Sequence, residues 1–375
     1  MSQTEVALIK AGSVVAGDLA AEAANIPVHS SAPAVGSQGN RYYDSTKNTI
    51  FISNGSVWQT LKTLTTTYKI DYLLVAGGGQ GGDQHGGGGG AGGFNNSHRG
   101  ELSGGGQCAK EPIHATVGTV FTITVGAGAT SSHPGSGADG ADGSDSSIAG
   151  TNSFSTITVE GGGGGAGHAD GGATGRNGGS SGGSGLTGSA GASNVGQGFD
   201  GGDNPGSGYA SFPQNGAGGG GAGGPGGNPA MNSRPTDNNF GAFGGEGVYS
   251  SITGTVVGYG GGGSGGSHDP HSPSSGIAHR GDPRAGHQVN IGKLFGGADG
   301  GLGNSGGGGN GTANTGGGGG GSGGINQPCG GGGSGVCILR MPTCNYTGTV
   351  TGSPTVTTVG TDTVVKFTGS GTYTA

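Results

Sequence analysis

Short apolar stretches separated by glycine, serine and asparagine recur along the chain and predict β-strands. In VFTITV, at 120–125, apolar and polar residues alternate, which is the pattern of a strand with one buried face. In YLLVAG, at 72–77, the apolar residues are continuous, as in a fully buried strand. The other strand-like stretches are Ile70–Val75, Phe154–Val159, Val248–Val257, Val336–Met341, Thr355–Val359, Thr363–Phe367 and Thr372–Thr374.

A β-hairpin is predicted near the N-terminus. Asn54-Gly55 stands between the strand-like stretches Thr49–Ser53 and Val57–Leu61, and this dipeptide is a strong signal for a tight hairpin turn. Trp58 is expected to pack against the aromatic side chains of the same small sheet, which are Tyr42, Tyr43 and Phe51.

The first 66 residues have an ordinary composition, unlike the glycine-rich remainder. Residues 4–24 are predicted to form a short helix ahead of the hairpin. Because so small a hairpin is only marginally stable alone, it needs a partner surface or further copies of itself. We therefore interpret 1–66 as an attachment or oligomerisation module and 67–375 as a separate glycine-rich domain.

Glycine dominates the remainder of the chain. Of the 375 residues 104 are glycine, and only 9% are charged. Glycine supplies no side-chain core and is costly to order, so hydrophobic packing is not expected to hold the middle of the chain together. The runs follow no fixed period, which argues against a solenoid of equal repeats and against collagen. The clearest runs are 86–93, 161–167, 218–227, 260–266, 306–311, 316–324 and 330–335.

Two common explanations of glycine runs fit poorly. A flexible linker explains one or two runs, but not a long series interleaved with strands and aromatic residues. A phosphate-binding loop requires GXXXXGK[ST], which is absent, and shorter glycine motifs arise by chance at this glycine content.

Packed polyglycine-II helices satisfy the backbone better. Such a helix has three residues per turn, rises ~3.1 Å per residue and makes no internal hydrogen bonds. Neighbouring helices can supply the partners that buried backbone groups need, provided that glycine lets the backbones approach. The predicted fold is mostly β and irregular: a small N-terminal β-hairpin module, then packed polyglycine-II helices flanked by β-strands. An outer helix would display Asp139, Asp142 and Asp145 in one exposed, solvated line.

Charge and apolar length argue against several classes of protein. The chain has 14 Lys and Arg against 21 Asp and Glu, a net charge of −7, and no basic cluster, so nucleic-acid binding is not expected. No apolar stretch approaches the ~20 residues of a membrane helix, and the N-terminus lacks the features of a signal peptide. We expect a protein made in the cytoplasm without membrane insertion. The cysteines match no zinc pattern and suit free thiols: Cys108, Cys329, Cys337 and Cys344.

No constellation of catalytic or metal-binding residues emerges from the sequence. The densest group of ligand-type side chains has irregular spacing around Pro270 and matches no defined zinc site. It comprises His268, His271, His279 and His287. The glutamates are scattered, and no serine, cysteine or carboxylate arrangement predicts catalysis. We predict a non-enzymatic protein without a cofactor or metal.

The order of motifs resembles the glycine-rich domains of bacteriophage tail-fibre proteins. The resemblance rests on YLLVAGGG and GGGGGAGGF, then VFTITVGAG, GGGGSGVCILR and KFTGSGTYT, over residues 68–375. The hairpin YYDSTKNTIFISNGSVWQ is similar to segments upstream of such domains. The tip adhesins of T-even-type phages, which pack polyglycine helices and bind receptors through variable loops, are similar in architecture but lack this hairpin and the β-rich closing segment.

The resemblance implies a role in attachment to the host cell. The implied partners are a host surface receptor, either an outer-membrane protein or a glycan, and other phage tail proteins, with the chain located in the virion. It further implies a homotrimer, with a single-copy tip as the alternative. A purely structural fibre or decoration protein without receptor contact is the competing function.

Segments between the glycine runs carry most large side chains and are the candidate receptor-binding loops. Exposed aromatic and arginine residues are typical anchors of binding surfaces, and loops on rigid scaffolds commonly carry function. The alternative for Phe212, Phe240 and Phe243 is that they plug the ends of the glycine helices. The predicted receptor-binding residues are Tyr209, Phe212, Arg234, Asn238, Phe240 and Arg280.

Overall fold

The structure is a computed structural model in which the chain is mostly β-strand and irregular. It describes residues 27–37, 40–47, 49–63, 67–132, 137–168, 174–204, 215–229, 242–267, 294–303 and 306–375. These ranges contain short 3-10 turns but no α-helix. The helix predicted over 4–24 lies outside the described residues.

The N-terminal sheet has four strands in the order β1-β2-β3-β4. They are β1 (Val28–His29), β2 (Arg41–Asp44), β3 (Thr49–Ser53) and β4 (Trp58–Thr63). The hairpin predicted around Asn54-Gly55 is present: β3 and β4 pair antiparallel, and Gly55 has a φ of 93°, which glycine adopts at little cost.

An aromatic cluster stabilises this sheet. The ring of Tyr42 stacks on Phe51 at 5.1 Å and meets Trp58 edge-on at 4.8 Å. The Trp58 indole donates a hydrogen bond to the carbonyl of Pro33 at 2.9 Å. These contacts match the packing predicted for Trp58 from the sequence.

Asp44 organises the turn between β2 and β3. Its carboxylate is fully buried and accepts hydrogen bonds from the Thr46 hydroxyl at 2.6 Å, the Thr46 and Lys47 backbone, and the Lys47 ammonium at 3.1 Å. The Thr46 hydroxyl is the largest influence that lowers the pKa of Asp44, from 3.8 to about 2.

We expect the N-terminal sheet to lose stability in acid because of Asp44. Since the pKa is lower in the folded state, the contribution is fully present above pH 4 and is lost as pH falls toward 2. Fluorescence of Trp58, the single tryptophan, measures this transition. In Asp44→Asn the acid-dependent step between these two values should disappear; a step of unchanged size would assign it to another group.

The glycine-rich part of the chain contributes a β-sandwich and a hairpin. One sheet has the order β15-β16-β13-β5-β6, with β7 also paired to β5, the other has the order β10-β9-β8-β17-β14, and β11 pairs with β12. The strands are β5 (Thr67–Val75), β6 (Phe94–Asn96), β7 (Ile113–Thr116), β8 (Val120–Thr124), β9 (Ser146–Gly150), β10 (Ile157–Val159), β11 (Val248–Ser250), β12 (Val257–Tyr259), β13 (Val336–Pro342), β14 (Val350–Thr351), β15 (Thr355–Val359), β16 (Asp362–Phe367) and β17 (Gly371–Thr374).

Two of the predicted strands differ from the structure. The stretch Val248–Val257 is not one strand but the beginning and end of a hairpin, because residues 251–256 turn between β11 and β12. The stretch Phe154–Val159 is shorter than predicted, since β10 begins only at Ile157. In the glycine-rich part, strands β6, β7, β9 and β14 were not predicted, because each is short and has only one large apolar residue.

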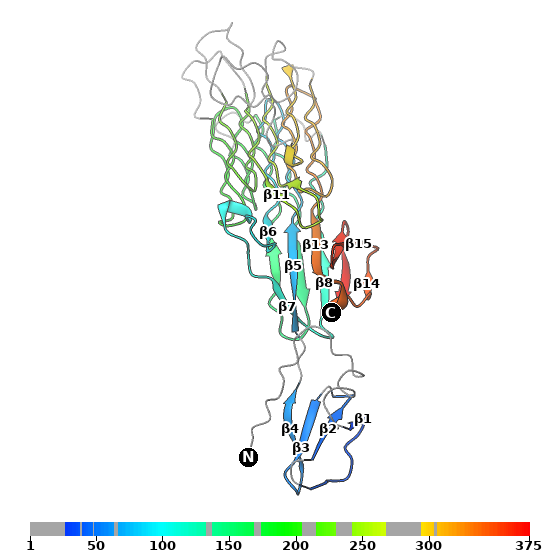
Figure 1. Ribbon diagram of the computed structural model, residues 1–375. Helices are drawn as coiled ribbons and strands as arrows, with labels where there is room; N and C mark the ends of the chain where they lie inside the picture. The colour runs from blue at the N-terminus through cyan, green and yellow to red at the C-terminus, as the bar shows by residue number, and fades with distance from the viewer. Residues whose placement is uncertain are drawn as a thin grey trace.

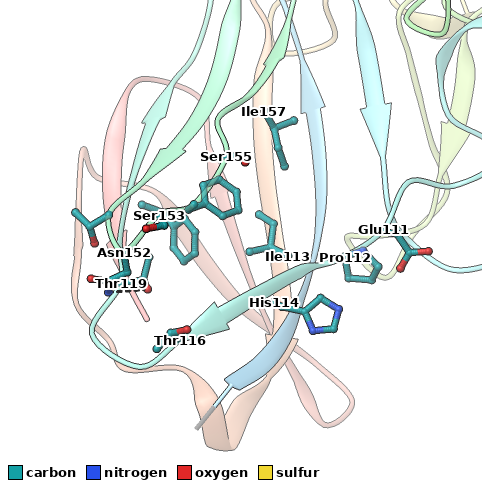
Figure 2. A pocket seen from close by; sticks show the side chains of 13 residues that line it. Glu111, Pro112, Ile113, His114, Thr116, Thr119, Asn152, Ser153, Ser155 and Ile157 are labelled. Carbon is teal, nitrogen blue, oxygen red and sulfur yellow. Dashed lines mark hydrogen bonds between the residues drawn. The ribbon is translucent and has the colours of Figure 1, made fainter. Parts of the chain in front are cut away.

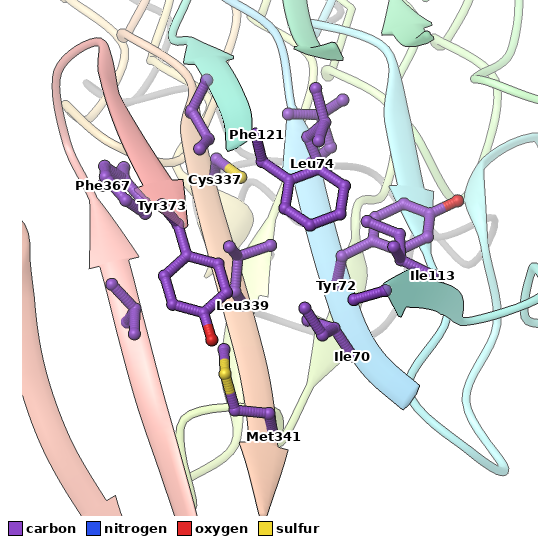
Figure 3. Close-up of a cluster of buried hydrophobic side chains, with 14 of the residues drawn as sticks. Ile70, Tyr72, Leu74, Ile113, Phe121, Cys337, Leu339, Met341, Phe367 and Tyr373 are labelled. Atoms are coloured by element: carbon purple, nitrogen blue, oxygen red, sulfur yellow. The ribbon is translucent and has the colours of Figure 1, made fainter. Parts of the chain in front are cut away.

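Two apolar clusters lie on opposite faces of β5 and β13. The first cluster fills the sandwich and includes Ile70, Tyr72, Phe121, Leu339 and Tyr373 (Figure 3). The second, on the outer face, includes Leu73 and Val75 and is covered by the β11–β12 hairpin. Strand β5 is buried on both sides, which explains its continuous apolar sequence.

Beyond the sandwich the chain forms long, side-by-side extended segments (Figure 1). We call these extended stretches the glycine segments; they include 76–82, 86–93, 137–145, 160–168, 261–267, 316–323 and 329–335. In the segment 76–82 and the adjoining Asp83, every third N–H group bonds to the same neighbour. The N–H groups of Ala76, Gly79 and Gly82 bond to segment 86–93, those of Gly77, Gln80 and Asp83 to segment 137–145, and those of Gly78 and Gly81 to segment 329–335. A three-residue period with three neighbours is the pattern of packed polyglycine-II helices.

Close backbone approach makes glycine necessary in the inner segments. A Cβ atom placed on Gly79, Gly89 or Gly319 would lie under 3.0 Å from backbone atoms of a neighbouring segment. One predicted run, 218–227, is not a single helix, because the chain turns at 222–224 and the Gly221 N–H bonds to the Gly224 carbonyl.

The aspartates of the outer segment 137–145 have a different role from the one predicted. Their side chains are exposed, but they are not merely solvated: the carboxylates of Asp139, Asp142 and Asp145 accept hydrogen bonds from three backbone N–H groups, every third residue of segment 160–168. Those donors are Gly167, Gly164 and Gly161, at 2.8–2.9 Å. The aspartates therefore supply the acceptors that a further glycine segment would otherwise supply.

Replacing the three aspartates should measure how much their carboxylate acceptors add to the free energy of unfolding. We expect Asp142→Ala to cost about 1 kcal/mol, the usual net value of one hydrogen bond, since its exposed ion pair with Arg176 contributes little. The three sites are ~9 Å apart, so the triple alanine variant should lose about 3 kcal/mol by addition. Urea unfolding measures the effect. Asp142→Asn keeps the acceptor oxygen and should remain near the parent; equal losses in both variants would contradict this role.

Candidate functional site

The ends of the glycine segments opposite the β-sandwich form the candidate functional site. We call the described residues there the distal layer: Asp83, His85, His168, Asn204, Asn215, Ser267 and Ser322. All six predicted receptor-binding residues lie outside the described residues, on 205–214, 230–241 and 268–293. The structure therefore fixes where these three segments begin and end, and not the six side chains themselves.

Four of the six residues that flank the three segments meet at one place: Asn204, Asn215, Ala242 and Ser267. The Asn204 amide donates to the carbonyl of Asn215 at 2.8 Å, which joins the two residues that flank 205–214. The N–H of Ala242, which follows 230–241, bonds to the carbonyl of Gly216 at 3.1 Å. Asn215 also forms a β-bridge with Ser267, the residue before 268–293. The structure thus brings together sequence positions that are up to 63 residues apart, from 204 to 267.

The third segment differs from the other two in where it returns. It leaves the distal layer after Ser267, but the chain resumes at Leu294 beside the β11–β12 hairpin. There the ring of Phe295 lies 4.5 Å from that of Tyr249. From Phe295 the chain runs parallel to 261–267 back to the distal layer, as the bonds from Gly261 to Phe295 and from Ser267 to Gly301 show.

A tight turn closes the first pair of glycine segments in the distal layer. Gln84 and His85 have φ values of 52° and 57°, and the Gly82 N–H bonds to Gly87 across the turn. The buried Asp83 carboxylate accepts hydrogen bonds from the Gln84 N–H at 2.9 Å, the Ser322 hydroxyl at 3.1 Å and the Gly137 N–H at 3.2 Å. One carboxylate therefore connects three segments that are distant in sequence.

Further polar groups adjoin the distal layer. Gln80 donates to the Ser132 hydroxyl at 2.9 Å and accepts from the Ala141 N–H at 3.1 Å. Burial, and then the charge of Asp83, raise the pKa of the nearby Cys329 to about 12, so this thiol stays protonated. The four cysteines are free, with Cys329 and Cys337 buried and the other two exposed.

The distal layer shows no complete metal site. The rings of His85 and His168 lie 6.2 Å apart, but among the described residues no group of three His, Cys, Asp or Glu side chains could hold a metal ion. His268, His271, His279 and His287 lie outside the described residues. The described polar groups of the layer form a hydrogen-bonded support at the ends of the glycine segments.

Asp83 and His85, which form the turn in the distal layer, were not predicted as site residues from the sequence. Asp83 and His85 stand in GGGQGGDQHGGGGG, at 77–90, where the only residues other than glycine are Gln80, Asp83, Gln84 and His85. A short polar interruption of a glycine run is the signal that could have located the turn, because only there does the chain leave the close packing. Phe243, which follows 230–241, lies against Gly227, in agreement with the plug alternative for that phenylalanine.

Comparison with known proteins adds one family. In the described part of the chain no helix has the length and apolar character needed to cross a membrane. No curated protein and no solved structure matches the chain. A glycine-rich domain family model matches residues 52–342. Because this match covers well over half of the sequence, the chain belongs to the glycine-rich domain family.

Proposed function

We propose that this protein is a bacteriophage tail-fibre or tail-tip protein that attaches the virion to a host surface receptor, without enzymatic activity. The single observation that carries the proposal is that four residues flanking the three large-side-chain segments meet at Asn215–Gly216: Asn204, Asn215, Ala242 and Ser267. Segments that meet on one rigid base can act as one binding surface, which is how loops on other scaffolds bind their targets. The order of sequence motifs supports the phage assignment.

The distal layer suits the role of a rigid support. Its backbone groups bond to neighbouring segments, and the side chains of Asp83 and Asn204 hold the backbones of Gly137 and Asn215 in place. Such pre-organisation reduces the entropy lost on binding. The proposed partners are an outer-membrane protein or a glycan of the host, together with other tail proteins, and the proposed assembly is a homotrimer.

An alanine panel over the six predicted residues tests the proposal. Attachment energy should concentrate in a few aromatic and arginine anchors, so Arg234→Ala or Tyr209→Ala should weaken binding to host cells by at least ~1 kcal/mol, several-fold in affinity. Because the chain carries few charges, binding should change little with salt concentration. Cell binding by the purified protein, and competition with phage adsorption, measure these effects.

The matched control is Arg176→Ala. Arg176 is half-exposed on the side of the glycine segments and pairs with Asp142 at 2.7 Å, so its loss should leave attachment unchanged. Each variant is first checked for parental thermal unfolding. If all six variants bind host cells like the parent, attachment does not use these segments, and the alternative of a structural fibre or decoration protein without receptor contact is favoured.

A further inference from the structure

A hollow of about 350 Å³ opens in the β-sandwich, between strand β7 and the loop 151–156 that joins β9 to β10 (Figure 2). Its volume lies within the range of small-molecule sites, ~300–1,000 Å³. The hollow lies at the sandwich and not at the distal layer, so a ligand could bind there whether or not the distal layer attaches the chain to a host receptor.

The floor of the hollow is apolar and partly aromatic. Phe121 is buried, with 1% of its surface exposed, and Phe154 meets it edge-on with ring centroids 5.2 Å apart. Phe154 is only half-buried, so part of its ring faces the hollow. Ile113 of β7 lines the opposite side. An accessible aromatic face beside aliphatic groups offers a flat apolar surface to a ligand.

The rim of the hollow is polar and nearly free of positive charge. Hydroxyl and amide groups come from Thr116, Thr119, Asn152 and Ser153, and the Asn152 amide donates to the Thr119 hydroxyl at 3.2 Å. The lining contains one carboxylate, of Glu111, and one imidazole, of His114, and it contains no Lys or Arg. Such a rim offers several hydrogen-bond donors and acceptors at fixed positions.

Two rim residues hold an unfavourable backbone conformation. Asn152 and Ser153 have φ values of 56° and 63°, whereas most described residues with positive φ in this chain are glycines. Non-glycine side chains in this region carry a conformational cost and cluster at ligand-binding positions. Glycine would relieve the strain at both positions, yet the chain has side chains there.

We propose that this hollow binds a neutral sugar unit. Anionic ligands such as phosphates or nucleotides are disfavoured, because Glu111 stands in the lining without an Arg or Lys. Wholly apolar ligands are disfavoured by the ring of hydroxyl and amide groups, which would lose their hydrogen bonds to water. A sugar has both features that the lining requires: a face of C–H groups for Phe154 and hydroxyls for Asn152, Ser153 and the threonines.

The test uses three free sugars: glucose, galactose and N-acetylglucosamine. Saturation-transfer NMR on the full chain should show transfer to at least one of them, with a dissociation constant in the millimolar range. The double variant Asn152→Gly/Ser153→Gly removes both rim side chains, and glycine accepts these φ values without strain. We expect its affinity for that sugar to fall at least tenfold.

The matched control is Asn326→Gly/Ser353→Gly. These exposed residues have φ values of 61° and 53° and lie elsewhere on the chain, so the control repeats the same chemical change outside the hollow and should bind like the parent. The proposal is overturned if the parent shows no transfer to any of the three sugars, or if the rim variant binds as tightly as the control.

Discussion

Replacing Gly318 with valine is expected to destroy most of the stability of the glycine segments. A Cβ atom at Gly318 would lie under 3.0 Å from backbone atoms of Gly89 and Gly263. Overpacking normally costs about 1–3 kcal/mol, because neighbouring side chains can move. Here the neighbours are backbones that are themselves hydrogen-bonded, so the loss in free energy of unfolding should exceed about 4 kcal/mol. Thermal and denaturant unfolding measure it.

Gly369→Val is the matched control for this substitution. Gly369 precedes β17, and a Cβ atom there would meet nothing within 4 Å. The change should stay within the ±0.5 kcal/mol that is usual for surface sites. If Gly318→Val melted at the parental temperature, the close packing of segment 316–323 between its neighbours would be wrong.

Asp83→Ala should open the distal layer while the β-sandwich remains folded. The substitution removes the acceptor of the Gly137 N–H group. The Gln84 N–H keeps the Ser322 Oγ at 2.9 Å as an acceptor, and the Ser322 hydroxyl can donate to the carbonyl of Gly324. A buried donor left without a partner costs about 1–3 kcal/mol, so the local loss should lie in that range. Hydrogen exchange at the Gly137 amide should accelerate by about tenfold or more, whereas exchange in β5 and β13 should change little.

Asp203→Ala serves as the control for this prediction. Asp203 is exposed and its carboxylate accepts one hydrogen bond, from the Ala190 N–H at 2.7 Å; water can replace it, so the cost should stay below about 1 kcal/mol. Protection at Gly137 that survives in Asp83→Ala would show that other contacts hold the layer together.

Much of the architecture follows from local sequence signals. The Asn54-Gly55 turn, the continuous apolar run of β5 and the alternation in β8 each depend on neighbouring residues alone, and each is present as predicted. The polyglycine-II pattern was also predictable, because a long series of glycine runs leaves backbone groups that only other backbones can satisfy. The assignment of 1–66 and 67–375 as two domains stays a prediction.

The neighbours of each segment could not be predicted from the sequence. Glycine runs are interchangeable in composition, so nothing local says that 76–82 lies beside 86–93, 137–145 and 329–335 at once. The role of Asp139 could not be predicted for the same reason, because it accepts a hydrogen bond from a residue 28 positions away. The hollow could not be predicted either, because Asn152 and Ile113 line it together only in the folded sandwich.

The three-neighbour hydrogen bonding of the glycine segments has a mechanical consequence. The bonds run across the long axis of the molecule, between segments that are joined at their ends. A pull along that axis therefore tends to slide whole segments past each other, so that many bonds share the force and must break together. Glycine is usually a source of flexibility, but here it should give a stiff body whose resistance to stretching grows with segment length and comes mainly from backbone hydrogen bonds.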